Sequence, residues 1–167
     1  RYALMGKHAV ACGCGLSRRA APQVLKLLLE CGLPTLFDAD GLNLIAADDA
    51  LKALLRPHHL ITPHPGEAAR LLGRPLSDPL ADALALNSLG CQALLKGATS
   101  VIPVGGVNWL SASGCAGMAK GGSGDILSGM VLSLLGQGMP PFEAACAAVF
   151  THGLAGDLAA KEKGARG

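Results

Sequence analysis

Aromatic and charged residues are scarce in this sequence. Phe, Trp and Tyr make up 3% of the 167 residues, Asp, Glu, Lys and Arg together 16%, and the formal net charge is only +2. Proteins that bind nucleic acids usually carry a basic stripe or aromatic side chains on which bases stack. The sequence has neither, so we expect no nucleic-acid partner.

Long apolar runs are also missing, although half of the residues are hydrophobic. No run reaches the roughly 18 residues that span a bilayer, and no signal peptide follows Arg1, so we expect no membrane association. The six cysteines lack the C-x-x-C spacing of zinc and redox sites. This pattern predicts buried, reduced thiols in a cytoplasmic protein. The length suits a single domain, residues 1–167.

Short apolar runs alternate with longer segments of helical periodicity. We expect strands at 8–12, 33–37, 60–62, 91–95, 100–104 and 107–110, and helices at about 20–31, 48–55, 67–72, 78–89, 125–135 and 141–161. This order predicts an α/β sandwich with a mostly parallel sheet. Ligands of such sheets bind beyond the carboxyl ends of the strands. Loops 13–15, 38–40, 62–67 and 96–97 follow strands, so we expect them to meet at one sheet edge.

The segment MAKGGSGDILSGM, residues 118–130, is the most informative one. Gly121, Gly122 and Gly124 lack Cβ atoms, so the backbone of 121–124 can turn several N–H groups toward an anion. A helix follows, and its dipole also favours a phosphate. Asp125 stands beside this expected anion site, where it either takes part in the chemistry or caps the helix. Both interpretations remain open from these residues alone.

Three further loops carry polar side chains. Lys96 and Gly97 end a buried strand, where Lys96 either contacts a nucleotide or only faces water. His64 lies between two prolines that fix its direction. It either donates or accepts a hydrogen bond with a substrate or has the structural role that is more common for a single histidine, and Glu67 could cap the next helix. Asp38 and Asp40 could hold Mg²⁺ through water or anchor loops.

Two other features are weaker signals. The run Gly13-Cys14-Gly15 is a poor dinucleotide fingerprint, because Arg18 stands where a third glycine would be needed. His152 and Asp157, on or beside the last helix, are interpreted as structural.

Together these motifs resemble the ADP- or ATP-dependent NAD(P)H-hydrate dehydratases of the ribokinase-like superfamily. The resemblance runs over most of the chain, and the run Thr62 to Glu67 with Asp38-Ala39-Asp40 distinguishes this branch. It implies a three-layer α/β/α sandwich, here without its N-terminal portion. It also implies a hydro-lyase that restores NADH and NADPH from their hydrates, using ADP or ATP as co-substrate with Mg²⁺.

The resemblance also implies roles for individual residues. Asp125 would be catalytic, as a general base, and no residue is assigned to a dedicated metal site. The hydrated dinucleotide would contact Gly15, His64 and Asp125. The adenine nucleotide would contact residues of two loops: Lys96, Gly97, Ala98, Thr99 and Ser100, and the glycine-rich turn of Gly121, Gly122, Ser123 and Gly124. A homo-oligomer, a tetramer in many members, and fusion to an epimerase domain in the full-length protein are implied as well.

The sequence departs from the family at three positions. Cys14 replaces a usual Pro, Ser17 a usual Gly, and Cys115 a common Asn. The family's first segment and last helix are also missing, so we expect a truncated domain. Two alternatives stay open: a small-molecule kinase of the same superfamily, which would not need His64 in its proline frame, and a truncated domain that binds nucleotide without turnover.

Overall fold

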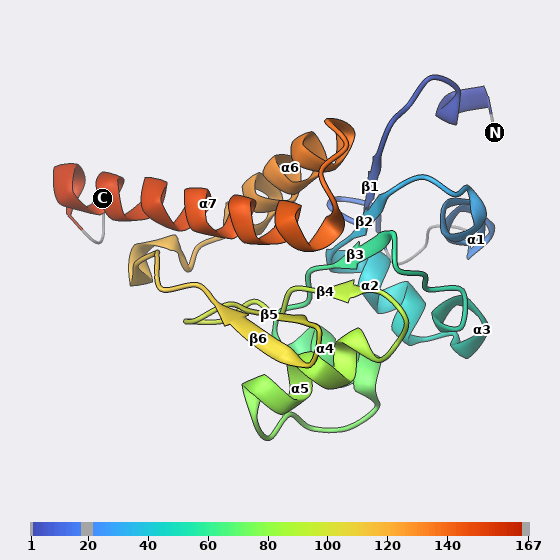
Figure 1. The fold of residues 1–167 in the computed structure, drawn as a ribbon, viewed down its shortest axis with the longest axis horizontal. Coiled ribbons are helices and arrows are strands. Elements are labelled where there is room, and N and C mark those ends of the chain that lie inside the picture. The colour runs from blue at the N-terminus through green and yellow to red at the C-terminus, as the bar shows by residue number, and fades with distance from the viewer. Residues whose placement is uncertain (1, 18–21, 165–167) are drawn as a thin grey trace.

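The computed structural model describes residues 2–17 and 22–164. Strands and helices alternate through most of the chain (Figure 1). The strands are β1 (Val10–Cys12), β2 (Thr35–Phe37), β3 (His59–Ile61), β4 (Gln92–Ala93), β5 (Val101–Val104) and β6 (Val107–Leu110). The helices are η1 (Tyr2–Leu4), α1 (Pro22–Glu30), α2 (Ala39–Ala46), α3 (Asp49–Lys52), α4 (Pro65–Leu72), α5 (Pro79–Asn87), η2 (Ala116–Met118), α6 (Ser123–Gly136) and α7 (Pro141–Lys163).

The central sheet has the order β1-β2-β3-β4, and every pair in it is parallel. Strands β5 and β6 form a separate antiparallel pair that contacts the sheet through a bridge between Leu95 and Val101. Gly105 and Gly106 connect the pair with positive φ angles of 55° and 83°, as a tight hairpin turn requires. The expected mostly parallel sheet is confirmed.

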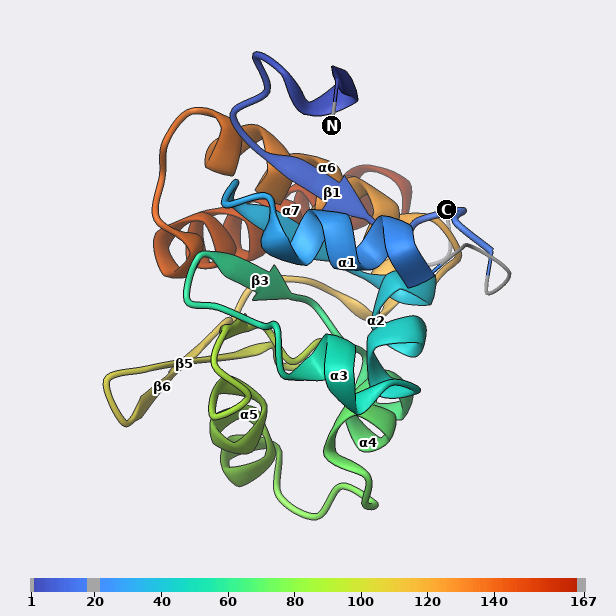
Figure 2. The same ribbon diagram turned by 90° about the vertical axis from the view of Figure 1, so that its right-hand side faces the viewer.

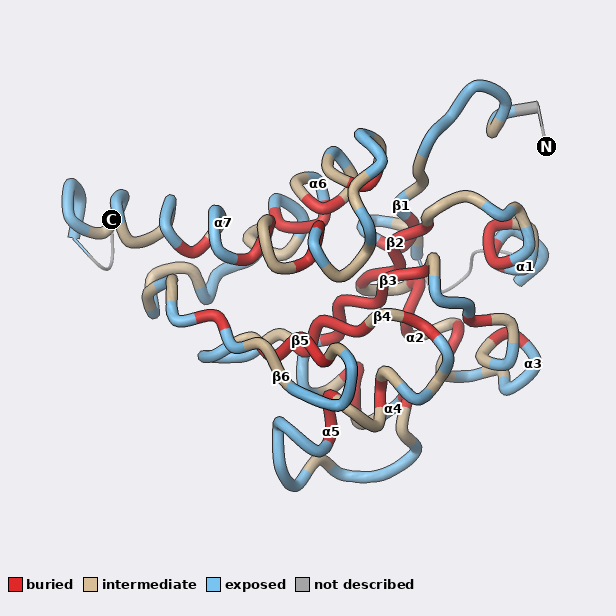
Figure 3. Tube along the Cα trace, viewed as in Figure 1, coloured by how far each residue is buried: buried red, intermediate tan, exposed pale blue. Residues whose placement is uncertain are grey.

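Side chains of the central strands alternate between two cores. Phe37, Ile61 and Ala93 pack with α1 to α5, whereas Leu36 and Leu60 pack with α6 and α7. Strands β2 and β3 are buried along their whole length (Figure 3), which explains why most of their residues are apolar. Figure 2 shows the helices α1, α3, α4 and α5 gathered on the side of the sheet away from α7. The chain therefore forms the expected three layers.

Helix α2 is the main element that the sequence pattern did not predict. Its segment contains Gly41 and Asn43, both weak helix formers, and the preceding acidic residues suggest a turn. The helix begins because the Asp38 carboxylate accepts a bond from the Ala39 N–H. A Cβ on Gly41 would lie 2.7 Å from the Cys12 carbonyl oxygen. Glycine is thus needed for α2 to pack on β1.

The remaining boundaries differ from the expected ones by a few residues. Strand β4 covers only two residues, yet Leu94 N donates to the Ile61 carbonyl at 2.8 Å and continues the ladder. Helix α6 begins at Ser123, two residues early. Residues 20 and 21 of the expected first helix lie outside the described residues. No helix among the described residues is long and apolar enough to cross a membrane.

Candidate functional site

The loops that follow β1, β2, β3 and β4 meet at the carboxyl edge of the sheet, as expected. Asp38 N donates to the Cys12 carbonyl at 3.1 Å, and Lys96 N donates to the Pro63 carbonyl at 2.8 Å. Gly13 is packed so closely that an added Cβ would overlap the Asp38 carbonyl oxygen. This edge therefore brings residues from four distant parts of the chain together.

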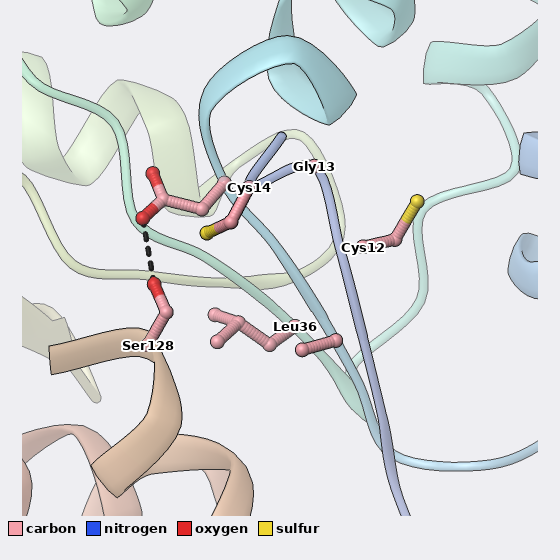
Figure 4. A pocket seen from close by; sticks show the side chains of 7 residues that line it. Cys12, Gly13, Cys14, Leu36 and Ser128 are labelled. Carbon is pink, nitrogen blue, oxygen red and sulfur yellow. Dashed lines mark hydrogen bonds between the residues drawn. The ribbon is translucent and has the colours of Figure 1, made fainter. Parts of the chain in front are cut away.

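Asp38 is the centre of a hydrogen-bond network at this edge. Its carboxylate is almost fully buried and accepts bonds from Lys96 Nζ at 2.7 Å, Ser128 Oγ at 2.7 Å and Ala39 N at 2.8 Å. The bond that ends at Ser128 is drawn in Figure 4. Three donors satisfy most of the lone pairs of a carboxylate. Asp38 thus anchors loops, one of its two predicted roles, and Asp40 lies in the first turn of α2.

A small cavity of about 70 Å³ opens beside this network. It is lined by Ala11, Cys12, Gly13, Cys14, Leu36, Asp38 and Ser128. In Figure 4 the side chain of Cys14 points toward the hydrogen-bonded pair, whereas that of Cys12 points away. Part of Cys14 is exposed, so the expectation that the thiols are buried fails for this residue.

Cys14 also lies close to Asp125. The pKa of the Cys14 thiol is raised to about 11, first by burial and then by its hydrogen bond to the Asp125 carboxylate and the negative charge of Asp38. The thiol is therefore protonated at neutral pH and lies close to the Asp125 carboxylate. This contact joins the loop after β1 to the start of α6, where Asp125 lies in the first turn.

Helix α6 is not capped by Asp125. The N-cap residue is Gly122, whose φ of 88° needs a glycine. The alternative that Asp125 only caps the helix is therefore wrong, since the carboxylate lies three residues inside and makes no capping bond. Asp125 is exposed. It lies at the end of the helix whose dipole favours anions.

His64 is itself a capping residue. Its Nδ1 accepts a bond from the Gly66 N–H at 3.0 Å at the start of α4, and the buried Glu67 carboxylate accepts from the His64 N–H at 2.9 Å. Glu67 Oε1 also lies 3.3 Å from His64 Nε2. The structure confirms that Glu67 supports the start of the helix, and it adds a capping role that the sequence pattern did not predict for His64.

A large cavity of about 810 Å³ lies between the loop after β4, the glycine-rich turn and α7. Its lining residues include His64, Lys96, Gly97, Ala98, Ser100, Gly121, Ser123, Gly124 and His152. Most residues expected to bind the adenine nucleotide thus share one cavity. Thr99 and Gly122 are not part of its lining, and Gly15 lines neither cavity.

One wall of the large cavity is held by close packing of α7. Asp157 accepts a bond from the Gly114 N–H at 3.0 Å, and Ser113 Oγ donates to the Phe150 carbonyl at 3.1 Å. A Cβ on Gly153 would lie 2.6 Å from the carbonyl carbon of Ser113. Asp157 is therefore structural, as expected. His152 lines the cavity, and burial lowers its pKa.

Sequence reasoning missed several residues of this site, and two of them carry polar groups that bear on its chemistry. Ser128 bonds Asp38, and Lys120 lines the large cavity beside the glycine-rich turn. Ser128 lies three residues after Asp125, so the two share one face of α6, and a serine in an otherwise apolar helix was the available signal. No group of three or more His, Cys, Asp or Glu side chains in residues 2–17 and 22–164 could hold a metal ion.

Comparison with known proteins agrees with this architecture. The model of the NAD(P)H-hydrate dehydratase family matches residues 3–167. The chain is 38% identical over 164 residues to the ADP-dependent (S)-NAD(P)H-hydrate dehydratase of Neisseria meningitidis serogroup B, covering 93% of this chain and 55% of that protein. It is 44% identical over 140 residues to the bifunctional NAD(P)H-hydrate repair enzyme Nnr of Escherichia coli K12, covering 80% of this chain and 26% of that one.

A solved structure gives the same result. The ADP/ATP-dependent NAD(P)H-hydrate dehydratase from Bacillus subtilis, co-crystallized with ATP/Mg²⁺ and soaked with CoA, superposes with a TM-score of 0.80 at 30% identity. The match covers 96% of this chain and 60% of that structure. The chain belongs to the NAD(P)H-hydrate dehydratase family. It spans from about a quarter to about half the length of the two curated relatives.

Proposed function

We propose that the protein catalyses the ADP- or ATP-dependent dehydration of hydrated NADH and NADPH. The observation that carries the proposal is the place of Asp125. It follows directly on Gly124, which lines the large cavity, and it contacts Cys14 of the loop after β1. A carboxylate between two loops that the family assigns to different ligands is placed to take a proton from one ligand while that ligand attacks the other.

The chemistry requires help because a ring hydroxyl is a poor leaving group. In the proposed reaction Asp125 takes the proton of that hydroxyl as the hydroxyl oxygen attacks the terminal phosphorus of the nucleotide. The bond from that phosphorus to the nucleotide breaks, and the N–H groups of 121–124 stabilise the transferred charge. The phosphate then leaves the ring with its bonding electrons, and the ring loses a proton to give the dihydronicotinamide.

We assign the two proposed ligands, the adenine nucleotide and the hydrated dinucleotide, to different loops. Lys96, Gly97, Ala98 and Ser100 border the large cavity with the glycine-rich turn, which supports their role toward the adenine nucleotide. His64 reaches the same cavity from the loop after β3, and Gly15 has open space around it. We assign these two residues to the dinucleotide. Mg²⁺ would arrive with the nucleotide phosphates, because Asp38 is already bonded to three protein donors.

We also propose a cytoplasmic homo-oligomer. Phe150, Leu154 and Leu158 leave about half of their surface exposed, at 51%, 43% and 53%. Their spacing of four residues places them on one face of α7, which suits contact with a second copy. Light scattering of the wild-type protein and of Leu154→Glu tests this, and a monomer in both cases contradicts it.

The function is tested by supplying NADH hydrate with ADP or ATP and Mg²⁺ and measuring the absorbance of restored dihydronicotinamide. The expected product appears only with nucleotide and is lost in Asp125→Asn. If no dihydronicotinamide is restored, but a parallel assay that supplies a vitamin-precursor alcohol with ATP yields its phosphate ester and ADP, the kinase alternative is favoured. Nucleotide binding without any turnover would favour the non-catalytic one.

A further inference from the structure

The described side chains that line the large cavity carry positive charge and no negative charge. Among the described residues that line it, Lys96 and Lys120 are cationic, and no Asp or Glu takes part. The N-terminus of α6 adds its positive dipole end. Such a cavity attracts an anion, and the strength of that attraction depends on which cations remain uncompensated.

The charge of Lys96 is already compensated within the protein. Its Nζ lies 2.7 Å from Asp38 Oδ1, and only 21% of the Lys96 side chain is exposed. Asp38 is buried at the sheet edge, and its carboxylate cannot turn away without losing the hydrogen bonds from Ser128 Oγ and Ala39 N. A ligand that recruits Lys96 therefore has to compete with a short, largely buried ion pair.

Lys120 is in the opposite situation. It is exposed, and it forms no ion pair with any residue of 2–17 or 22–164. Its backbone is fixed, because Lys120 N donates to the Met118 carbonyl at 2.8 Å and its carbonyl accepts from Ser123 N at 3.3 Å. The side chain thus starts from a defined turn directly before the N–H groups of 121–124.

We propose that Lys120 binds the terminal phosphate groups of the nucleotide, an assignment that rests on the proposed function. The α-phosphate and adenosine of any adenine nucleotide are held by the rest of the cavity, whereas the contribution of Lys120 grows with each added phosphate. A flexible ammonium group next to backbone N–H donors is suited to this, since it can follow a phosphate that is transferred.

The test compares AMP, ADP and ATP by calorimetric titration with the wild-type protein, Lys120→Gln and Lys120→Arg. Lys26→Gln, on the exposed face of α1, is the matched control. Lys120→Gln is expected to weaken ATP binding by about tenfold or more and ADP binding by several-fold, while AMP changes less than about twofold. Lys120→Arg retains the charge and should stay within about threefold of wild type. High salt should reduce the difference between ATP and AMP more in wild type than in Lys120→Gln.

Two outcomes separate the possible failures. If the wild-type protein binds ADP and ATP, but Lys120→Gln weakens all three nucleotides equally or no more than Lys26→Gln does, the assignment of Lys120 is wrong and the proposed function stands. If the wild-type protein binds none of the three nucleotides, the proposed function fails and the assignment of Lys120 fails with it.

Discussion

Lys96 and Asp38 stand 58 residues apart in the chain and form an ion pair of 2.7 Å between Nζ and Oδ1. The pair joins the loop after β4 to the end of β2, and Ser128 connects the same carboxylate to α6 at 2.7 Å. One buried acid thus holds both the loop expected to bind nucleotide and the helix that carries Asp125. The predictions below test this arrangement.

Lys96→Met should lower the free energy of unfolding by about 2 to 4 kcal/mol, because it leaves a buried carboxylate without its cation. Asp38→Asn should be destabilising as well, while the double variant should recover at least about 1 kcal/mol relative to the sum. Urea denaturation of the four proteins measures this coupling. Strict additivity would show that the pair contributes no interaction energy.

Asp125→Asn should leave the fold intact and remove turnover. The residue is in the first turn of α6 but is not its cap, so the stability change should stay within about 1 kcal/mol. Loss of a general base should reduce kcat by on the order of a thousandfold or more. Steady-state kinetics and thermal denaturation check both parts, and a rate near wild type would exclude a proton-transfer role.

His64 calls for two variants, because its ring caps α4. His64→Asn keeps a good N-cap residue, whereas His64→Ala loses about 1 kcal/mol of stability. Both should raise the KM for the hydrated dinucleotide, with a hydrogen bond worth about 1 to 3 kcal/mol at stake. Nucleotide affinity should stay within about twofold. If nucleotide affinity falls while the KM holds, the assignment of His64 is wrong.

Stability should fall on acidification through His59. Burial, and then the charges of His58 and Arg56, lower the pKa of His59 to about 4. The unfolded chain therefore binds a proton below about pH 6.5 that the folded protein does not bind until about pH 4. As the pH falls across this window, His59 should lower the free energy of unfolding by up to roughly 3 kcal/mol.

The control for His59 is His59→Asn, whose side-chain oxygen can still accept the Arg56 N–H that His59 Nδ1 accepts at 3.0 Å. This variant should be less stable at pH 7, since it loses buried contacts, but its stability should depend less on pH between 6.5 and 4. The same slope in both proteins would show that other groups, His152 among them, account for the acid sensitivity.

Gly153→Ala should damage the large cavity more than Gly156→Ala. A Cβ at Gly153 would meet the backbone of Ser113, whereas one at Gly156 would meet only the flexible side chain of Met118. We expect a loss of about 2 kcal/mol or more, with weaker nucleotide binding, for Gly153→Ala. Gly129→Ala, where α6 leaves open space, should be neutral or stabilising. If Gly153→Ala and Gly156→Ala destabilised the protein equally, this account of the packing of α7 would be contradicted.

The sequence predicted the layers better than it predicted the bonds between them. Continuous apolar runs identified the buried strands around Phe37 and Ile61, because parallel strands need apolar residues on both faces. Helix α2 was not predicted, because Gly41 lowers helix propensity. A glycine is needed there because the backbone packs against the Cys12 carbonyl, which belongs to another element. His64 was recognised as fixed in direction, but its capping role depends on the backbone of α4.

The sequence by itself determined the order of the elements, the place of the glycine-rich turn at a helix start and the edge of the sheet at which four loops would meet. These follow from periodicity and chain direction, which are local properties. Only the tertiary structure decided that Asp38 neutralises Lys96 and leaves Lys120 uncompensated, and that Cys14 lies close to Asp125. Pairings of this kind depend on burial and on distances between residues far apart in the chain, which no local pattern encodes.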